Sequence, residues 1–386
     1  MPNFNNIKNA FEDKKNIDLK KAYFLFKTIS YPLISKALTW LLRIAMMLRL
    51  PIIPIVKWSI YNHFCGGITI KDSNNTINKL WKYKIGTILD YSAEGKEIEE
   101  DFNNVVNQTI ESIKVSKNNP KIPFAVFKLT GIAPFNLLEK ANNKSILNDQ
   151  EKVEYNKLIK RVNQICQEAN DNNTPVFFDA EESWIQNTID DICLQMMIKF
   201  NKQKTIIFNT VQLYRHDRID YINKIILQAE EKKFKIGLKL VRGAYHEKEI
   251  LRAKSKLLRP AVHMLKIDTD KDYNFALNIC LENINSVSIC AGTHNEESCM
   301  YLIKLMKKFN IKNNDERIHF SQLLGMSDHI SYNLSKELFN TSKYVPYGPV
   351  REVIPYLIRR AEENTSISGQ MGRELSNIVA EIKRRN

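Results

Sequence analysis

Cysteine is scarce in this 386-residue chain, and its six cysteines lie far apart. No two of them form a Cys-x-x-Cys pair, and no histidines stand at the spacing that would complete a zinc site. We therefore predict no bound metal, and we expect the cysteines to be reduced, mostly buried thiols. They are Cys65, Cys166, Cys193, Cys280, Cys290 and Cys299.

The chain also lacks an uninterrupted apolar run of about 20 residues, which is the length that a membrane-spanning helix needs. Its most apolar stretch, Leu33 to Phe64, is interrupted by four basic residues and broken by Pro51 and Pro54. The N-terminus has no charged region followed by an apolar core, so secretion is not expected. We expect a cytoplasmic protein, which could lie peripherally on the inner face of the plasma membrane.

No glycine-rich phosphate-binding loop of either common type occurs, so a nucleotide would have to be held in another way. Lys and Arg number 57 against 43 Asp and Glu, which gives a net charge of +14. Such a charge attracts nucleic acid, anionic lipid and acidic substrates alike. The basic residues are scattered among Asn and Ile, however, so nucleic acid is not an expected partner.

The first 80 residues precede any regular strand pattern and are expected to be helical. Residues 33–64 have two interpretations: a helical layer packed on the main domain, or helices that lie in a bilayer surface with their basic residues toward the headgroups. We expect three regions, which are an N-terminal helical region (1–80), a catalytic domain (81–370) and a C-terminal helical tail (371–386).

From residue 85 onward, eight short apolar runs recur with helical patterns between them. Each run is continuous and rich in β-branched or aromatic residues, as in parallel strands covered on both faces. Strands that alternate with helices predict βαβ units, and eight of them predict a closed (βα)8 barrel. The runs are Ile85–Tyr91, Phe124–Leu129, Pro175–Ala180, Thr205–Gln212, Lys235–Val241, Ser286–Gly292, Arg317–Leu324 and Ser342–Pro346.

Polar residues gather at the carboxyl ends of these runs, where barrel enzymes carry their active sites. This clustering favours an enzyme over a purely structural barrel. The polar residues are Asp90, Glu94, Lys128, Asp179, Glu181, Glu182, Gln212, Tyr214, Arg215, Lys239, Arg242, Tyr245, Thr293, His294, Asn295, Gln322 and Tyr344.

The segment after the last run predicts a turn and then a helix through Asn364, with Pro349 in the turn and Pro355 in the first helical turn. Tyr356, Arg359, Arg360 and Glu363 would share one side of this helix. Two adjacent guanidiniums beside an aromatic ring suit a small carboxylate. A solvated basic face on a surface helix remains the alternative.

The chemistry at the other strand ends stays open at this point. Lys128 could form a Schiff base with a carbonyl substrate, or it could be a charge-paired lysine that helps to hold a carboxylate. Asp179 to Glu182 lacks the further ligands that a metal site needs. His294 could act as a base or as a hydrogen-bond partner of a cofactor.

Six segments, taken together and in this order, resemble the FAD-dependent proline dehydrogenases over about residues 85–370. The resemblance is to the stand-alone type found in eukaryotes and some bacteria. The segments are Leu89–Gly95, Phe178–Glu182, Gly237–Tyr245, Gly292–Asn295, Gln322–Met326 and Tyr356–Asn364.

The resemblance implies a distorted (βα)8 TIM barrel that binds FAD at the carboxyl ends of its strands. It implies oxidation of L-proline to Δ1-pyrroline-5-carboxylate, with hydride passing from proline C5 to flavin N5 and electrons passing on to a membrane quinone. That acceptor would give residues 33–64 a role in peripheral membrane contact.

The resemblance also implies roles for individual residues. Arg359, Arg360 and Lys128 would pair with the proline carboxylate, Tyr344, Tyr356 and Leu323 would form the apolar wall over the ring, and Asp179 would orient Lys128 and Tyr344. The flavin contacts would be Ala180, Gln212, Lys239, Arg242, Gly243, Ala244, Lys266, Thr293, His294, Asn295 and Glu363.

One residue departs from the pattern of the fused bacterial relatives, which carry Arg where this chain has Lys239. A lysine can still donate a hydrogen bond near flavin N5, but it lacks the planar fork of arginine. Relatives that favour hydroxyproline resemble this chain but have a smaller residue at Tyr344. Three alternatives remain: a hydroxyproline dehydrogenase of the same fold, a Schiff-base barrel lyase using Lys128, and a non-catalytic membrane-associated binding protein.

Overall fold

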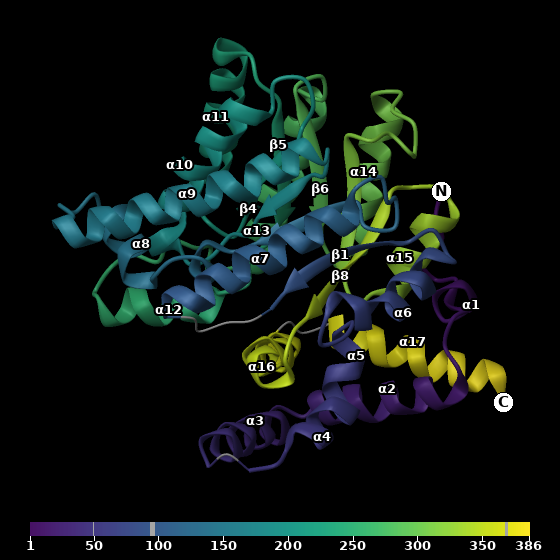
Figure 1. The fold of residues 1–386 in the computed structure, drawn as a ribbon. Coiled ribbons are helices and arrows are strands. Elements are labelled where there is room, and N and C mark those ends of the chain that lie inside the picture. Colours follow the sequence, from purple (N-terminus) through teal and green to yellow (C-terminus); the bar gives the residue numbers. More distant parts are fainter. Residues whose placement is uncertain (49, 93–96, 367–369) are drawn as a thin grey trace. The chain divides into compact units, whose positions relative to one another are not determined.

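The structure is a computed structural model that describes residues 1–48, 50–92, 97–366 and 370–386 (Figure 1). For residues 32, 361–366, 370 and 371 it describes the backbone alone. Within the described part of the chain, no helix is both long and apolar enough to cross a membrane. All six cysteines are buried and none is in a disulfide, as predicted.

Eight parallel strands form a closed barrel in chain order, which confirms the predicted (βα)8 fold. Each strand agrees with its predicted run to within two residues at either end, because a continuous apolar run marks a strand buried on both faces. The strands are β1 (Gly86–Tyr91), β2 (Phe124–Phe127), β3 (Val176–Phe178), β4 (Ile207–Gln212), β5 (Ile236–Val241), β6 (Val287–Gly292), β7 (Ile318–Leu323) and β8 (Thr341–Tyr347).

Helices fill the segments between the strands and both ends of the chain. They are α1 (Ile7–Ala10), α2 (Asn16–Ile29), α3 (Pro32–Met47), α4 (Ile53–Val56), η1 (Lys57–Tyr61), α5 (Asn62–Phe64), α6 (Ile70–Trp81), α7 (Glu99–Ser116), η2 (Leu129–Gly131), α8 (Phe135–Asn142), α9 (Asp149–Asp171), α10 (Ser183–Phe200), α11 (Arg218–Lys232), α12 (His246–Ser255), α13 (Lys266–Glu282), α14 (Glu296–Lys308), α15 (Asp328–Lys336), α16 (Val350–Ser366) and α17 (Gln370–Arg385).

The chain divides into two compact units. Unit 1 consists of Met1–Glu94, Gln322–Glu337 and Thr341–Asn386, and unit 2 consists of Gly95–Ser321 and Leu338–Asn340. Unit 1 therefore holds α1 to α6, α15 to α17 and the strands β1 and β8. Unit 2 holds β2 to β6 with α7 to α14, and β7 passes from unit 2 into unit 1.

Unit 2 has an aromatic core at the amino ends of its strands. The rings of Phe124 and Phe177 stack with centroids 4.4 Å apart, and Phe208 meets both edge-on at 5.5 Å. His319 packs against Phe124 at 5.0 Å, and burial lowers the pKa of His319 to about 3, so the ring is neutral. Aromatic pairs in these geometries are favourable beyond the area they bury.

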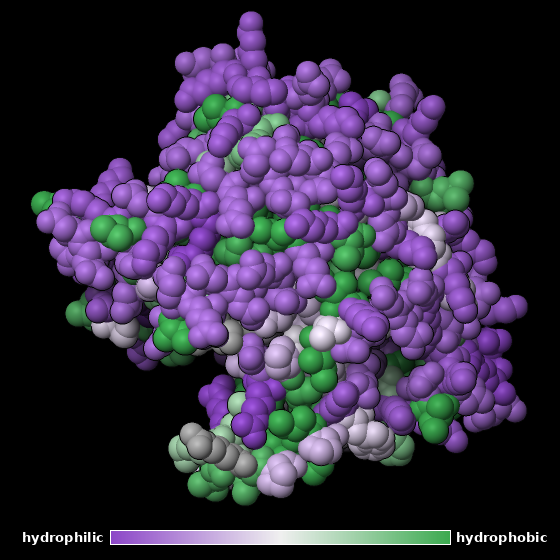
Figure 2. Space-filling model, viewed as in Figure 1, coloured by the Kyte–Doolittle hydropathy of each residue, from purple (hydrophilic) through white to green (hydrophobic). Residues whose placement is uncertain are grey.

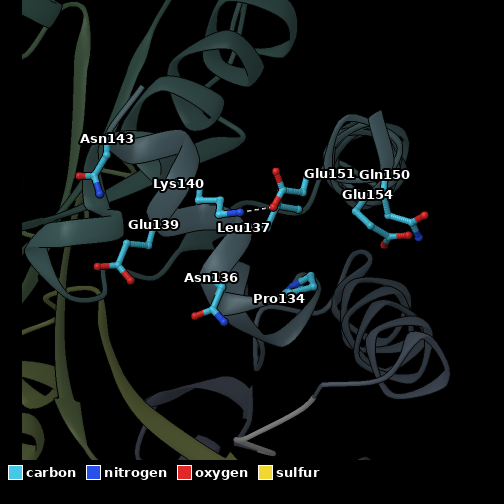
Figure 3. Close-up of a pocket in the computed structure, with 9 residues that line it drawn as sticks. All are labelled: Pro134, Asn136, Leu137, Glu139, Lys140, Asn143, Gln150, Glu151 and Glu154. Atoms are coloured by element: carbon cyan, nitrogen blue, oxygen red, sulfur yellow. Dashed lines mark hydrogen bonds and ion pairs between the residues drawn. The ribbon is translucent and has the colours of Figure 1, made fainter. Parts of the chain in front are cut away.

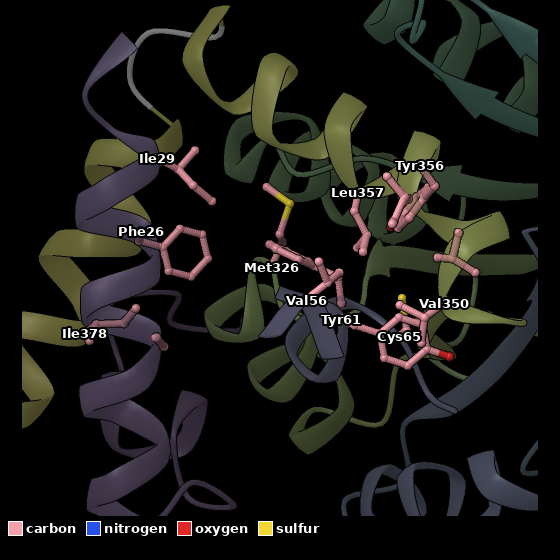
Figure 4. Close-up of a cluster of buried hydrophobic side chains, with 14 of the residues drawn as sticks. Phe26, Ile29, Val56, Tyr61, Cys65, Met326, Val350, Tyr356, Leu357 and Ile378 are labelled. Atoms are coloured by element: carbon pink, nitrogen blue, oxygen red, sulfur yellow. The ribbon is translucent and has the colours of Figure 1, made fainter. Parts of the chain in front are cut away.

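Unit 1 is built around a buried apolar cluster to which α2, η1, α5, α16 and α17 all contribute (Figure 4). In Figure 4, Tyr356 and Leu357 of α16 point toward Met326, Val56 and Tyr61. The Tyr61 hydroxyl lies 2.6 Å from the carbonyl oxygen of Gly67 and 2.8 Å from that of Gly348, and these two acceptors share its single proton. The N-terminal helices are thereby tied to the turn that follows β8.

The prediction that Pro355 lies in the first turn of its helix is wrong, because α16 begins at Val350 and Pro355 is inside it. The carbonyl of Pro349 already accepts hydrogen bonds from the N–H groups of Glu352 and Val353, so the helix starts directly after Pro349. Of the two prolines, only Pro349 lies before the helix. Because Pro355 has no N–H, it cannot bond the carbonyl of Arg351 one turn earlier.

Candidate functional site

The carboxyl ends of β3 to β6 in unit 2 carry a set of polar side chains, among which Asp179 contacts Lys239 and Arg242 contacts Thr293. We call this set the polar rim, and it consists of Asp179, Gln212, Lys239, Arg242 and Thr293. All five lie at the same end of parallel strands, which is where barrel enzymes hold substrates and cofactors.

Asp179 and Lys239 form an ion pair, in which Lys239 Nζ donates to Asp179 Oδ1. Both residues are more than nine-tenths buried. The hydroxyl of Thr210 also donates to Asp179, at 3.5 Å, and Lys239 Nζ lies 5.1 Å from the centroid of the Phe177 ring. The Lys239 ammonium is therefore fixed at the end of β5 by a carboxylate and an aromatic face.

Gln212 connects the ends of β3 and β5. Its Nε2 donates to the carbonyl of Glu181 at 2.7 Å, and its Oε1 accepts from the N–H of Ala244 at 3.3 Å. Gly243, the residue before Ala244, has φ +133°, and a Cβ at this position would lie 2.6 Å from the Tyr214 ring. Only glycine fits this position, so the backbone conformation after β5 depends on Gly243.

Arg242 is held by three oxygen acceptors. Its guanidinium donates to Asp270 at 2.7 Å, to the Thr293 hydroxyl at 2.7 Å and to the Ser298 hydroxyl at 2.9 Å. Asp270 also accepts from Lys266 Nζ at 2.6 Å. The structure thus brings Arg242 and Lys266, two of the predicted flavin contacts, to one carboxylate, and it bonds a third, Thr293, to Arg242.

Asn295, another predicted flavin contact, caps α14. Its side chain accepts a hydrogen bond from the N–H of Ser298 at 2.8 Å, and its own N–H donates to the Thr293 hydroxyl at 3.1 Å. Asparagine is a common N-cap residue and typically accepts this hydrogen bond. His294, between Thr293 and Asn295, is half-buried, as is Ala180 after β3.

Lys128 is half-buried and immediately precedes η2. The turn that follows it is anchored by Glu181, whose carboxylate accepts from the N–H of Thr130 at 3.1 Å and from the Thr130 hydroxyl. Glu181 thus links the turn after Lys128 to the strand end that carries Asp179. Its position among the polar strand ends was visible in the sequence, but its partner was not.

Replacing Glu181 with glutamine is expected to reduce the pH dependence of stability. Burial raises the pKa of the Glu181 carboxyl to about 7 from its ordinary 4.5, although the hydrogen bonds from Thr130 act in the opposite direction. A folded-state pKa above the unfolded one gives a contribution that is complete below the unfolded pKa and is lost as pH rises through about 7. Between about pH 5 and about pH 8, we expect the wild type to lose on the order of 2–3 kcal/mol relative to Glu181→Gln in urea unfolding. Parallel pH profiles of the two proteins would contradict this.

In unit 1, the predicted substrate-wall residues belong to one region. Leu323 packs against the apolar cluster that contains Tyr356, and the carbonyl of Tyr344 accepts from the N–H of Leu324 at 2.9 Å. The guanidinium carbon of Arg360 lies 5.5 Å from the Tyr356 ring centroid, and Arg359 beside it is half-buried. Glu363 is in α16, but its side chain lies outside the described residues.

A separate surface pocket of about 500 Å³ lies in unit 2 at α8 and α9 (Figure 3). Lys140 and Glu151 form an ion pair within it. None of the predicted site residues lines it, so we do not assign it to the site. Among the described residues, no group of three or more His, Cys, Asp or Glu is placed to hold a metal ion.

Comparison with known proteins assigns the chain to a family. The sequence profile of the family described as proline dehydrogenase matches residues 73–373. "Proline dehydrogenase 1, mitochondrial" of Dictyostelium discoideum is 33% identical over 374 residues, which cover 86% of this chain and 65% of that protein. The carbapenem antibiotics biosynthesis protein CarD of Pectobacterium carotovorum subsp. carotovorum is 30% identical, over 83% of each chain.

The fold is similar to that of proline utilization A (PutA) from Bdellovibrio bacteriovorus, solved after inactivation by N-propargylglycine. The TM-score is 0.73 at 17% identity, over 96% of this chain and 40% of that one. This chain therefore spans less than two thirds of the Dictyostelium protein and less than half of PutA. Because the family profile matches more than half of its residues, the chain belongs to the proline dehydrogenase family.

Proposed function

We propose that the protein is an FAD-dependent proline dehydrogenase that oxidises L-proline to Δ1-pyrroline-5-carboxylate, the first step of proline catabolism to glutamate. The observation that carries this proposal is the polar rim in a chain of this family, because it gathers a carboxylate, an amide, two cations and a hydroxyl at the carboxyl ends of four successive strands. The relatives named proline dehydrogenase support the substrate.

The donor set of the polar rim fits a flavin dinucleotide. Arg242 and Lys266 share the single carboxylate of Asp270, which leaves a surplus positive charge suited to phosphate. Gly243 lets the backbone after β5 pass close to the Tyr214 ring and place the N–H of Ala244 against Gln212. When bound, FAD would supply the hydride-accepting ring. The residues proposed to hold it are Ala180, Gln212, Lys239, Arg242, Gly243, Ala244, Lys266, Thr293, His294, Asn295 and Glu363.

Arg359 and Arg360 on α16 would bind the carboxylate of proline. A guanidinium can bond a carboxylate through two parallel N–H groups, which fixes its orientation. Their positive charge would also lower the pKa of the substrate ammonium, and the neutral amine is the form from which hydride can leave C5. Tyr344, Tyr356 and Leu323 would contact the ring. The roles predicted for Lys128 and Asp179 stay predictions.

The visible spectrum of the purified protein tests this function. We expect bound flavin, released on denaturation as FAD, whose oxidised band bleaches when L-proline is added without oxygen. A colourless protein, or a flavin band that proline leaves unchanged, would contradict the proposal. If borohydride instead trapped a substrate on Lys128, the protein would be a Schiff-base lyase.

We further propose that the electrons pass to a membrane quinone and that residues 33–64 of unit 1, together with Tyr31 just before them, contact an anionic bilayer surface. In the sequence, no Asp or Glu stands between Asp18 and Asp72, whereas eight Lys or Arg do. Several large apolar side chains of this segment are exposed, and Figure 2 shows hydrophobic side chains gathered over α3 and α4 along the lower edge of the view. They are Tyr31, Leu33, Ile34, Leu38, Trp40, Leu41, Met47, Leu48, Leu50, Ile55 and Trp58.

Basic residues beside exposed aromatic side chains are typical of helices that lie in a membrane interface. Trp40 is 62% exposed and Trp58 is 65% exposed, and Lys21 Nζ lies 5.4 Å from the Trp58 ring centroid. Charge complementarity favours an anionic lipid surface as the partner, and attachment of this kind would be peripheral.

The protein is therefore expected to sediment with anionic vesicles and to be released by salt, because salt screens the attraction of basic residues to the surface. Replacing Trp40 and Trp58 with aspartate should weaken binding by at least roughly ten-fold, since each change removes apolar burial and adds repulsion. Leu257→Asp is the matched control, because Leu257 is 95% exposed in unit 2 and should not matter. Equal binding of both variants and the wild type would rule out this surface.

A further inference from the structure

The segment between β7 and α15, residues 323–328, is held from several sides by side chains of other elements in unit 1. Its backbone is unusual, because Gly325 has φ +77° and Ser327 has φ +51°. A Cβ at Gly325 would lie 2.5 Å from the carbonyl oxygen of His63, so the segment approaches α5 closely. A segment in such a conformation persists only where its surroundings impose it.

Lys343 of β8 provides the central contact. Its side chain is completely buried, and its Nζ lies 2.8 Å from Asp328 Oδ1. The same ammonium donates to the carbonyls of Met326 and, at 3.4 Å, Leu323. An ammonium has three N–H donors, and the oxygens of Leu323, Met326 and Asp328 accept one bond from each of them.

Asp328 is shared between two lysines. Its other oxygen, Oδ2, lies 3.3 Å from Nζ of Lys14, in the N-terminal segment between α1 and α2. Burial alone would raise the pKa of Asp328, but the charges of Lys343 and Lys14 hold that pKa well below its usual range. The carboxylate is therefore charged at neutral pH.

Two further side chains fix the middle of the segment. The Nε2 of His63 lies 2.9 Å from the carbonyl oxygen of Gly325, and since a carbonyl only accepts, Nε2 carries the proton. Burial lowers the pKa of His63 to about 4, so this ring is neutral. The N–H of Ser327 donates to Glu374 Oε1 at 2.5 Å. Side chains from outside the segment thus bond every residue of it except Leu324, whose N–H donates to the carbonyl of Tyr344.

We propose that Lys343 and Asp328, supported by Lys14, are positioning residues for substrate binding. Their ion pair holds the segment that begins with Leu323, and Lys343 directly precedes Tyr344 in β8. Since successive side chains of a strand point to opposite faces, Lys343 faces the segment while Tyr344 faces the other way. This rests on the proposed function, in which Leu323 and Tyr344 contact the proline ring.

Lys14→Met and Asp328→Asn are the first variants to measure, by the KM and kcat for proline. We expect KM to rise by about three- to five-fold for Lys14→Met and by about ten-fold or more for Asp328→Asn, with kcat and flavin content near those of the wild type. Lys14→Arg restores the charge and should restore KM. Lys20→Met is the matched control, because Lys20 is exposed on α2 and its replacement removes an equal charge.

The double variant Lys343→Met/Asp328→Leu separates positioning from stability. Replacing a buried ion pair by apolar side chains often leaves stability unchanged, so its Tm should stay close to that of the wild type. It cannot bond the carbonyls of Leu323 and Met326, so a modest drop in Tm is expected from these groups, while its KM should remain about ten-fold raised. Amide exchange of residues 323–328 should speed up in parallel, and this readout does not depend on activity.

If the variants had a lowered Tm but an unchanged KM, the contacts of Lys14, Asp328 and Lys343 would serve stability alone. That result would overturn the positioning role, even if amide exchange of residues 323–328 became faster. So would a double variant with both Tm and KM like the wild type. A wild-type protein that binds flavin but does not oxidise proline would instead overturn the proposed function, and this positioning role with it.

Discussion

Arg359→Met and Arg360→Met are each expected to raise the KM for proline by roughly thirty-fold to several-thousand-fold while the flavin stays bound. Truncating one partner of a buried, hydrogen-bonded charge pair costs about 2–5 kcal/mol, which corresponds to this range. Methionine keeps much of the aliphatic stem, so packing beside Tyr356 should largely survive. Steady-state kinetics and the flavin-to-protein absorbance ratio measure the two effects separately.

The same helix offers a matched control for these variants. Arg351 is exposed on α16, so Arg351→Met removes an equal charge without touching the proposed carboxylate site. We expect its KM to match that of the wild type. If Arg359→Met and Arg360→Met behaved like Arg351→Met, the two arginines would be part of a solvated basic face, which is the alternative that the sequence left open.

The wild type is expected to prefer proline to trans-4-hydroxyproline, and Tyr344→Ser is expected to shift that preference. Tyr344 is only 8% exposed, so a hydroxyl pressed against its ring would be buried without a good partner. Burying an unpaired hydroxyl costs about 1–3 kcal/mol, which corresponds to roughly five-fold to more than hundred-fold discrimination. Serine would relieve the contact and would weaken proline binding by removing the ring.

The measurement is the ratio of kcat/KM for the two substrates in the wild type, Tyr344→Ser and Tyr344→Phe. Phenylalanine keeps the ring and removes the hydroxyl, so it should retain the preference if the ring causes it. A wild-type ratio near one, or a ratio that serine leaves unchanged, would show that Tyr344 does not set specificity.

The barrel could be read from the sequence because its strands are continuous apolar runs, and that pattern depends only on local burial. The position of Pro355 could not be read in the same way. A proline is most often found in a first turn, but here the bonds to the Pro349 carbonyl fix the start of α16 earlier. Tertiary contacts at the turn after β8, including the bond from Tyr61 to Gly348, determine that start.

The site residues divide in a similar way. Their presence at strand ends followed from the sequence, but their partners did not, because each partner comes from another element. The ion pair of Asp179 with Lys239 joins β3 to β5, and the pair of Lys343 with Asp328 joins β8 to α15. A lysine inside a buried strand was a usable signal for Lys343, since a buried ammonium needs an anionic partner. Nothing local to β8 identified that partner as Asp328.

Unit 1 also has a consequence for biosynthesis, because it is made of segments from both ends of the chain. The hydrogen bond from Tyr61 to Gly348 spans 287 residues. At a synthesis rate of about 5–20 residues per second, α2 to α5 leave the ribosome roughly 15 to 60 seconds before α16, which packs on the same apolar cluster. During that interval the nascent N-terminal helices expose both the apolar face that α16 later covers and the face that stays exposed in the finished protein. A bilayer or a chaperone that meets the growing chain would therefore encounter these helices first.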